Sequence, residues 1–207
     1  MDDLATQADR KPRTERGRKT LRKLLDAAAV EFADHGFHEA SISGITRRAG
    51  VALGTFYTYY DSKDAIFRAL VRDMSEAVGT AARDAIEPDM GPLAVERAAL
   101  QAFLEFAAEH KEVYRIIDEA EFVDPVSYRA HYERIGDRIE QRLKAGASTD
   151  GLRADLGEPE AWAVMGMNVF LGLRYAIWAQ DGDPDPATVA KIANRLLREG
   201  IAGSKPD

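Results

Sequence analysis

A short segment of the sequence, GVALGTFYTYYDSKDAI at residues 50–66, gathers hydroxyl groups, aromatic rings and a lysine. If the segment is helical, Phe56 and Tyr60 lie four residues apart on one face, where they can fix a helix too short to be stable alone. The hydroxyls of Tyr57 and Tyr59 then project outward. Hydroxyl groups and a cation suit the phosphates and base edges of a DNA major groove. The residues that would make such contacts are Thr55, Tyr57, Thr58, Tyr59 and Lys63.

Packing of aromatic rings in a helical core is the plainer interpretation of this segment. It accounts for Phe56 and Tyr60, but not for the whole cluster. The elements around the cluster favour DNA binding instead. Two short predicted helices flank the sequence AGVALG at residues 49–54, where Gly50 permits a tight turn and Val51 is expected to fill the gap between the helices. This arrangement is typical of a helix-turn-helix.

The charge of the chain is divided unevenly. The net charge is −7, which alone argues against a nucleic-acid partner. Residues 10–60, however, hold 10 Lys and Arg against 5 Asp and Glu, whereas residues 61–207 hold 18 against 27. A basic N-terminal segment joined to an acidic remainder indicates that only the N-terminal part meets a polyanion.

The rest of the sequence predicts helices. Apolar residues recur at helical spacing from Leu21 to Phe32, and Gly36 is expected to end this first helix. Serine caps, prolines and a glycine mark the starts of later helices. These starts are Ser41, Gly54, Ser62, Pro125, Pro159 and the pair Asp185-Pro186. Because no strand pattern or internal repeat is present, the predicted fold class is all-α, with about nine helices.

The segment SISGITRRAGVALGTFYTYYDSKDAI resembles the DNA-binding segment of TetR-type transcriptional regulators. The resemblance runs from about Thr20 to Leu70 and depends on many positions at fixed spacing. These are Phe32, Gly36, Ile45, Ala49-Gly50-Val51, Gly54-Thr55, Tyr57, Tyr60 and Ser62-Lys63. The resemblance implies an Ω-shaped, all-α homodimer with a variable C-terminal effector domain. By position it implies DNA contacts from Thr55, Tyr57, Tyr59 and Lys63, with Ser43, Arg47, Leu53 and Thr58 as neighbours.

The chain is therefore expected to divide into three parts. These are a basic arm at residues 1–14, a three-helix helix-turn-helix DNA-binding domain at 15–61, and an effector-binding and dimerisation domain at 62–207. Eight cations precede or open the first helix and could reach a minor groove or neighbouring phosphates. They are Arg10, Lys11, Arg13, Arg16, Arg18, Lys19, Arg22 and Lys23. Alternatively, residues 1–14 form a disordered, solubilising tail.

Three positions depart from the family pattern. Gly44 replaces a commonly acidic residue, Thr46 a common alanine, and Ala52 a common serine or threonine cap. Loss of that cap is expected to cost roughly 1 kcal/mol of helix stability. The departures bear on which base sequence is read.

The longest apolar run, residues 161–179, is long enough for a membrane helix. Asn168 and Arg174 within it, and an acidic loop at each end, favour a helix buried on both sides instead. One stripe of this helix would face the protomer's own core and the opposite stripe a partner subunit, in an order that the pattern leaves open. The candidate dimer interface, completed by the last helix, is Trp162, Gly166, Val169, Gly172, Leu173, Ala176, Ile192 and Leu196. The opposite stripe is Met167, Leu171, Arg174 and Trp178.

Aromatic and apolar residues of the middle helices could line an effector cavity, although aromatics at helical spacing also fit a plain core. Arg174 lies on an apolar stripe and needs an anionic partner. That partner is either Glu119 or Glu121, or the acidic head group of an effector. The candidate effector residues are Phe103, Phe106, Tyr114, Ile117, Phe122, Tyr128, Tyr132, Asn168 and Arg174.

Other chemistries have no support in the sequence. The chain has no cysteine, so disulfides and thiolate metal sites are excluded. His110 and His131 have no ligand-spaced partners, and we expect no metal and no cofactor. No Gly-rich phosphate loop, HExxH or Gly-x-Ser-x-Gly motif indicates an enzyme. The N-terminus has no secretory signal, so a cytoplasmic protein is expected.

These patterns together predict a homodimeric, ligand-responsive transcriptional repressor that binds a near-palindromic DNA operator. A hydrophobic or amphipathic small molecule is the expected effector, and a fatty-acyl compound fits best if Arg174 faces the cavity. An architectural DNA-binding protein without an effector is the alternative, although it would not need an acidic body of roughly 130 residues. An enzyme is the least supported class.

Overall fold

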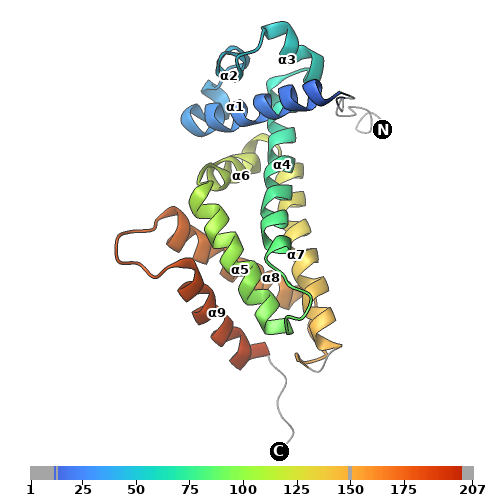
Figure 1. Ribbon diagram of the computed structural model, residues 1–207, viewed down its shortest axis with the longest axis vertical. Helices are drawn as coiled ribbons and strands as arrows, with labels where there is room; N and C mark the ends of the chain where they lie inside the picture. Colours follow the sequence, from blue (N-terminus) through green and yellow to red (C-terminus); the bar gives the residue numbers. More distant parts are fainter. Residues whose placement is uncertain (1–11, 13, 149–150, 202–207) are drawn as a thin grey trace, which may run out of the picture. The chain divides into compact units, whose positions relative to one another are not determined.

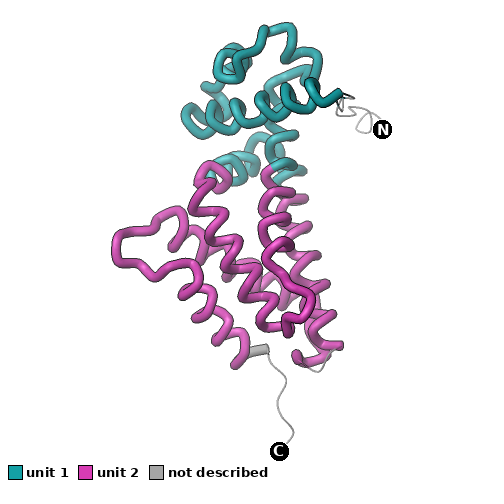
Figure 2. Tube along the Cα trace, viewed as in Figure 1, with its two compact units in different colours: residues 1–73, 115–128 teal, residues 74–114, 129–207 magenta. Residues whose placement is uncertain are grey.

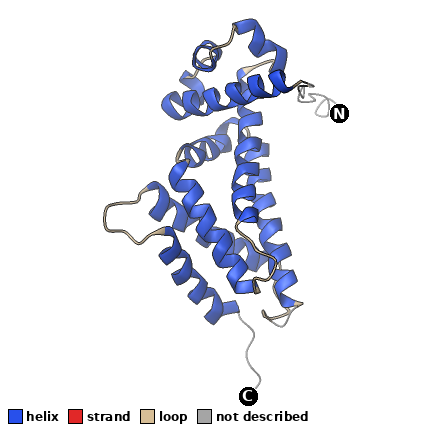
Figure 3. Ribbon diagram, viewed as in Figure 1, coloured by secondary structure: helices blue, strands red, loops and turns tan. Residues whose placement is uncertain are grey.

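The computed structural model describes residue 12 and residues 14–148 and 151–201, and all regular structure in them is helical (Figure 3). The predicted all-α class is confirmed, with nine α-helices in these residues. They are α1 (Glu15–Glu39), α2 (Ile42–Ala49), α3 (Leu53–Tyr59), α4 (Lys63–Asp84), α5 (Pro92–Glu109), α6 (Glu112–Val123), α7 (Pro125–Ala147), α8 (Glu158–Gly172) and α9 (Pro186–Ile201). A π-helical turn, η1 (Leu173–Ile177), continues α8.

By packing, the chain forms two compact units (Figure 2). The first, here called the head, comprises the described residues up to Asp73 together with residues 115–128. The second, here called the body, comprises residues 74–114 and the described residues from Arg129 onward. Three helices, α4, α6 and α7, therefore contribute to both units. The functional domain boundaries suggested by the sequence stay predictions.

The core of the head is aromatic. Phe32 and Phe37 contact the ring of Phe67 on α4 edge to face, with centroid distances of 5.2 and 5.0 Å. Ile45 of α2 and Phe56 of α3 are fully buried. Each of the first four helices thus adds a large side chain to the core, which is why helices as short as α2 and α3 can be stable.

The C-terminal end of α1 is held by α6. Gly36 has φ 72° and ψ 167°, so the helical conformation of α1 is broken there, where the sequence predicts the end of the first helix. Residues 37–39 follow as a short further turn. Just beyond Gly36, the backbone N–H of Phe37 donates to Glu119 Oε1 at 2.6 Å. Arg115 donates to the carbonyl of Ala33. Two side chains of α6 therefore satisfy backbone groups that an interrupted helix leaves without partners.

In the body, α5 packs against α8, η1 and α9 (Figure 1). Leu104 of α5 and Ala190 of α9 belong to one buried cluster, and Leu143 of α7 and Met165 of α8 to another. Helices α5 and α6 are separate, because His110 leaves the helical conformation with φ −125° and ψ 59°.

A buried polar pair joins α4 to α7. The hydroxyl of Ser75 lies 2.7 Å from Nδ1 of His131, and both residues are buried. Burial, together with the positive charges of Arg134 and Arg138, lowers the pKa of His131 to about 4. The imidazole is therefore neutral at pH 7, and His131 is a core histidine.

None of the described helices is long and apolar enough to cross a membrane. The apolar run at residues 161–179 is divided between α8 and η1.

Candidate nucleic-acid interface

Helices α2 and α3 form the predicted helix-turn-helix. Ser41 caps α2, with its Oγ accepting from the N–H of Gly44 at 2.9 Å. Gly50 ends the helix in the left-handed conformation with φ 65°. The N–H of Val51 then donates to the carbonyl of Thr46 at 3.1 Å. This is the Schellman arrangement, which favours glycine because a side chain at positive φ is strained.

Helix α3 has one buried and one exposed face. Phe56 is fully buried and Tyr60 is 6% exposed, with ring centroids 5.9 Å apart, so the predicted inner pair is confirmed. On the other face, Leu53 and Tyr57 are 50% and 47% exposed. This face can present apolar and hydroxyl groups to base edges and phosphates.

The neighbouring predicted contacts lie on α2 and α3. Ser43 and Arg47 are exposed, one turn apart on α2. Thr55 is half-buried. Thr58 is exposed, and its hydroxyl donates to the carbonyl of Gly54 at 3.2 Å, which leaves its oxygen able to accept a further bond. Contact between these residues and DNA stays a prediction.

Two residues that are predicted to contact phosphates, Tyr59 and Lys63, make contacts within the protein. The sequence predicts that Tyr59 projects outward. In the structure Tyr59 is instead half-buried beside Gly17 of α1. The ammonium of Lys63 donates to the carbonyls of His38 and Ala40 at 3.0 and 2.9 Å. Lys63 thus ties the start of α4 to the end of α1. The ammonium also lies 4.7 Å from the centroid of the Phe37 ring. Its third N–H makes no hydrogen bond within the described residues and could meet a phosphate.

The structure accounts for two of the three departures from the family pattern. Thr46 is buried, and its hydroxyl donates to the carbonyl of Ser43 at 3.2 Å, so the polar group is satisfied. Gly44 leaves room for the side chain of Glu31, because a Cβ there would lie 1.8 Å from Glu31 Oε1 and would force that carboxylate to move. Ala52 makes no side-chain cap at the start of α3, as its residue type implies.

Several cations of α1 are paired within the protein. Arg18 pairs with Glu15 at 2.7 Å, and Arg22 pairs with Asp26 and with Asp73 of α4 at 2.7 and 2.8 Å. The positive charge of the helix is therefore partly compensated. The arm residues Arg10, Lys11 and Arg13 lie outside the described residues, and the role of the arm on DNA stays a prediction.

The candidate effector residues have different surroundings. The rings of Phe103 and Tyr114 lie 6.4 Å apart, and the Tyr114 hydroxyl donates to the carbonyl of Val169 at 2.7 Å. Phe122, in contrast, is 82% exposed, because it lies on the solvent face of α6, whereas Ala120 lies on the buried face. Phe122 therefore does not line an interior cavity. Among the others, Ile117 is buried, and Phe106, Tyr128, Tyr132 and Asn168 are half-buried.

The anionic partner of Arg174 is Asp183, not Glu119 or Glu121. The guanidinium donates to both carboxylate oxygens of Asp183, at 2.7 and 2.9 Å. Hydrogen bonds from Arg174 and from the N–H of Gln180 hold the pKa of Asp183 below its usual value. The ion pair therefore fixes the loop between η1 and α9.

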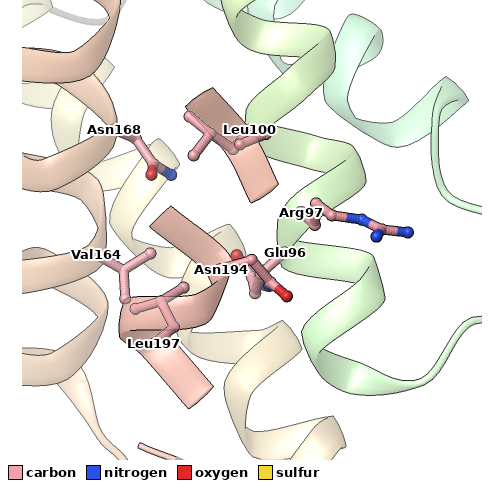
Figure 4. Close-up of a pocket in the computed structure, with 8 residues that line it drawn as sticks. Glu96, Arg97, Leu100, Val164, Asn168, Asn194 and Leu197 are labelled. Carbon is pink, nitrogen blue, oxygen red and sulfur yellow. The ribbon is translucent and has the colours of Figure 1, made fainter. Parts of the chain in front are cut away.

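Two hollows lie among the helices of the body. The first is narrow and contains Asn168 with the buried Glu96 and Asn194, while Arg97 points away from it (Figure 4). Glu96 pairs with Arg142 of α7 at 2.6 Å. The second, of about 170 Å³, is apolar and partly open to solvent. Its walls include Met167, Leu171, Tyr175, Val189, Ile192 and Leu196.

Only some of the residues predicted to form the dimer interface are exposed on α8 and α9. Gly172 and Ala176 are buried in the protomer, and a side chain at Gly172 would collide with Tyr114. These two positions therefore face the protomer's own core. The predicted residues that are exposed are Trp162, Ile192 and Leu196. Gly166, Val169 and Leu173 are half-buried. Phe170, which the sequence analysis did not select, is 71% exposed.

Sequence reasoning also missed Glu31, which is only 4% exposed. The helical period could have predicted this burial, because Glu31 lies three residues after the buried Ala28 and next to the buried Phe32. A glutamate buried at such a position needs a partner.

Comparison with known proteins agrees with the geometry of the head. Residues 24–70 match the family described as bacterial regulatory proteins, tetR family. The HTH-type transcriptional regulator YdgC of Bacillus subtilis is 27% identical over 191 residues, which cover 90% of this chain and 94% of that protein. The HTH-type transcriptional activator FasR of Mycolicibacterium smegmatis is 30% identical over 134 residues, covering 59% and 61%.

A solved structure shares the fold of most of the chain. It is the transcriptional regulator FadR from Bacillus subtilis in complex with stearoyl-CoA. The TM-score is 0.73 at 18% sequence identity, and the match covers 87% of this chain and 98% of that one.

Proposed function

Because the chain belongs to the TetR family of DNA-binding transcriptional regulators, we propose that it is a cytoplasmic, ligand-responsive repressor. It binds a near-palindromic operator as a homodimer, and a hydrophobic or amphipathic small molecule releases it. The observation that carries the proposal is the exposed face of α3. Leu53 and Tyr57 lie in solvent while Phe56 and Tyr60 anchor the helix, which can therefore enter a major groove.

Selection of duplexes from a random pool by the full-length protein tests DNA reading. We expect a near-palindromic site to be enriched, because one head contacts too few bases to be specific alone. Affinity for that site should fall linearly with salt on logarithmic axes. Binding without sequence preference would indicate an architectural protein, and an enriched site without two-fold symmetry would contradict the dimer.

For the dimer interface we propose the solvent-facing side of α8 and α9. Phe170, Ile192 and Leu196 are 71%, 51% and 63% exposed, and Ile192 and Leu196 line the apolar hollow. Exposed apolar groups gathered on neighbouring helices are typical of a protein interface. Two copies of the helix pair would form an isologous four-helix contact. Gly166, where a side chain would meet open space, is the glycine that permits close approach in this arrangement.

For the effector we propose a fatty-acyl compound. The middle helices of the body carry apolar and aromatic side chains, and a protein of the same fold was solved with stearoyl-CoA. Arg174 is already paired with Asp183, so an acidic head group must displace that carboxylate or meet another cation. The acyl class is therefore proposed without Arg174 as its anchor.

Titration of the protein–duplex complex tests the effector. Stearoyl-CoA, stearate and a neutral hydrophobe of similar length are the probes. We expect the acyl compounds to release the duplex and to raise the melting temperature of the free protein. Arg174→Met should respond as the wild type does. If no probe binds, the effector class is wrong, and if only Arg174→Met fails to respond, the anchor role of Arg174 is restored.

A further inference from the structure

A buried carboxylate of α1 lies at the N-terminus of α2. Glu31 is 4% exposed, and its Oε1 accepts from the N–H of Ser41, the N-cap residue, in a long hydrogen bond of 3.5 Å. Gly44 leaves room for this carboxylate, because a Cβ at that position would lie 1.8 Å from the same oxygen. The fit between the glycine and the glutamate is therefore specific.

This arrangement completes a capping box from outside the helix. In an ordinary capping box, the N-cap serine accepts from the N–H at N3, and a glutamate at N3 accepts from the N–H of the N-cap. Here Ser41 Oγ accepts from the N–H of Gly44 at 2.9 Å, but the residue at N3 is Gly44 itself, which has no side chain. Glu31 supplies the missing carboxylate from the neighbouring helix.

The same carboxylate also binds the last turn of α2. Glu31 Oε2 accepts from Arg48 Nε at 2.7 Å, and Arg48 Nη2 donates to Asp34 of α1, also at 2.7 Å. Burial raises the pKa of Glu31, but the hydrogen bonds from Arg48 and from the N–H of Ser41, with the charge of Arg48, outweigh it and lower the pKa. The ionised carboxylate thus fixes both ends of α2 against α1.

We propose that Glu31 is a positioning residue for DNA binding. It holds Ser41 and Arg48 against α1. The predicted DNA contacts Ser43 and Arg47, which lie close to these two residues on α2, are exposed. Rotation of α2 away from Glu31 would turn both predicted contacts out of their places on DNA. This role rests on the proposed DNA-binding function and assigns it a residue that does not itself touch DNA.

A purely structural role makes a different prediction. Replacing a buried charged group by an apolar residue of similar volume often leaves stability unchanged or higher. If Glu31 only holds the fold, Glu31→Leu should bind DNA normally at temperatures where it is folded. If Glu31 positions α2, DNA affinity should fall even in the folded protein.

The experiment uses the full-length protein and the duplex that the wild type selects from a random pool. Glu31→Leu should lower affinity for this duplex by about tenfold or more, because two ends of α2 are released together. The affinity of Glu31→Gln should lie between those of the wild type and Glu31→Leu. Its amide oxygen can accept from the N–H of Ser41 but carries no charge to pair with Arg48. Asp34→Asn removes only the outer partner of Arg48 and is the matched control, with affinity within about twofold of the wild type.

Rescue identifies the carboxylate as the cause. Gly44→Glu in a Glu31→Ala background, where the shorter side chain clears the space that Glu31 fills, places a carboxylate at N3 of α2, the ordinary position in a capping box. Affinity should return to within about threefold of the wild type. Gly44→Glu alone should bind weakly, because two carboxylates would compete for one space.

A double-mutant cycle with Arg47→Ala completes the test. Arg47→Ala should weaken binding in the wild type and much less in Glu31→Leu, where Arg47 is no longer held in place. Equal effects in both backgrounds, or full affinity of Glu31→Leu, would overturn the positioning role. If Glu31→Leu does not fold, the same cycle in Glu31→Gln decides. Failure of the wild type to select any duplex would instead overturn the DNA-binding function, on which this role rests.

Discussion

At the scale of single residues, Lys63 combines a structural role with a predicted functional one. Its ammonium donates to the carbonyls of His38 and Ala40 and lies 4.7 Å from the centroid of the Phe37 ring. A cation at the C-terminal end of a helix also interacts favourably with the helix dipole. A loss of DNA binding in a Lys63 variant therefore needs a separate measurement of stability before a phosphate contact is inferred.

Lys63→Met is expected to change both quantities. The free energy of unfolding should fall by about 1–2 kcal/mol, because two carbonyls at the end of α1 lose a charged donor. The dependence of DNA affinity on salt should flatten by about one ion if the third N–H meets a phosphate. Lys111→Met, at an exposed lysine of the body, is the control. Lower stability with an unchanged salt slope would leave Lys63 with a structural role only.

His131 predicts a loss of stability in mild acid. The pKa of the imidazole is about 4 in the folded chain and 6.5 in the reference state. Between these values the unfolded chain binds a proton that the folded chain does not, so stability is lost as the pH falls from 6.5 to 4. The full loss is about 3 kcal/mol.

Chemical denaturation at several pH values between 7 and 4.5 measures this loss. His131→Gln removes the titrating group and should show a flatter profile, although its absolute stability is lower. The same slope in both proteins would show that other groups cause the acid sensitivity.

At the scale of elements, local signals were sufficient where a helix end is closed by its own residues. Ser41, Ser62 and Asp185 accept N–H bonds in the first turns of their helices, as the sequence predicts. The inner pair of Phe56 and Tyr60 follows from the helical period, whereas Tyr59, predicted to face outward, lies beside Gly17 of α1. The caps and the inner pair need only the spacing of nearby residues.

Features that depend on residues distant in sequence could not be predicted in this way. The interruption of α1 at Gly36 is supported by Glu119, a residue of α6, and the partner of Lys63 is the end of α1. Glu31 acts on α2 only because the two helices pack together. In each case a backbone group or charge is satisfied by tertiary contact, which helical periodicity does not report.

The uncapped start of α3 provides a prediction for one element. Ala52→Ser should add a side-chain acceptor for the first turn and raise the free energy of unfolding by about 0.5–1 kcal/mol. Ala52→Gly, which supplies no acceptor, should change it much less. Thermal and chemical denaturation measure the difference. A serine variant no more stable than the glycine variant would show that the N-terminus of α3 is already satisfied.

At the scale of the whole molecule, the proposed dimer depends on an apolar surface that the protomer exposes to solvent. Phe170→Glu and Leu196→Glu place charges on this surface and should each weaken dimerisation by about a hundredfold or more. Phe122→Glu is the matched control, because Phe122 is 82% exposed but lies on α6. We expect it to remain a dimer.

Sedimentation velocity over a range of protein concentrations distinguishes these variants. The monomeric variants should also lose affinity for a near-palindromic duplex, since each head alone contacts half of it. Dimers that persist in both glutamate variants would place the interface elsewhere. A wild type that stays monomeric at high concentration would contradict the dimer altogether.

The hydrogen bonds from α6 to α1 limit how the DNA-binding segment of such a regulator can be exchanged between proteins. The head is built from two stretches of chain, because residues 115–128 pack with it. A chimera that exchanges only the N-terminal stretch would bring a foreign α1 to the Glu119 and Arg115 of the host. The stability of the exchanged DNA-binding segment would then depend on whether Glu119 of the host still accepts a hydrogen bond from the backbone N–H at the position of Phe37. New DNA specificities built by grafting should therefore carry both stretches.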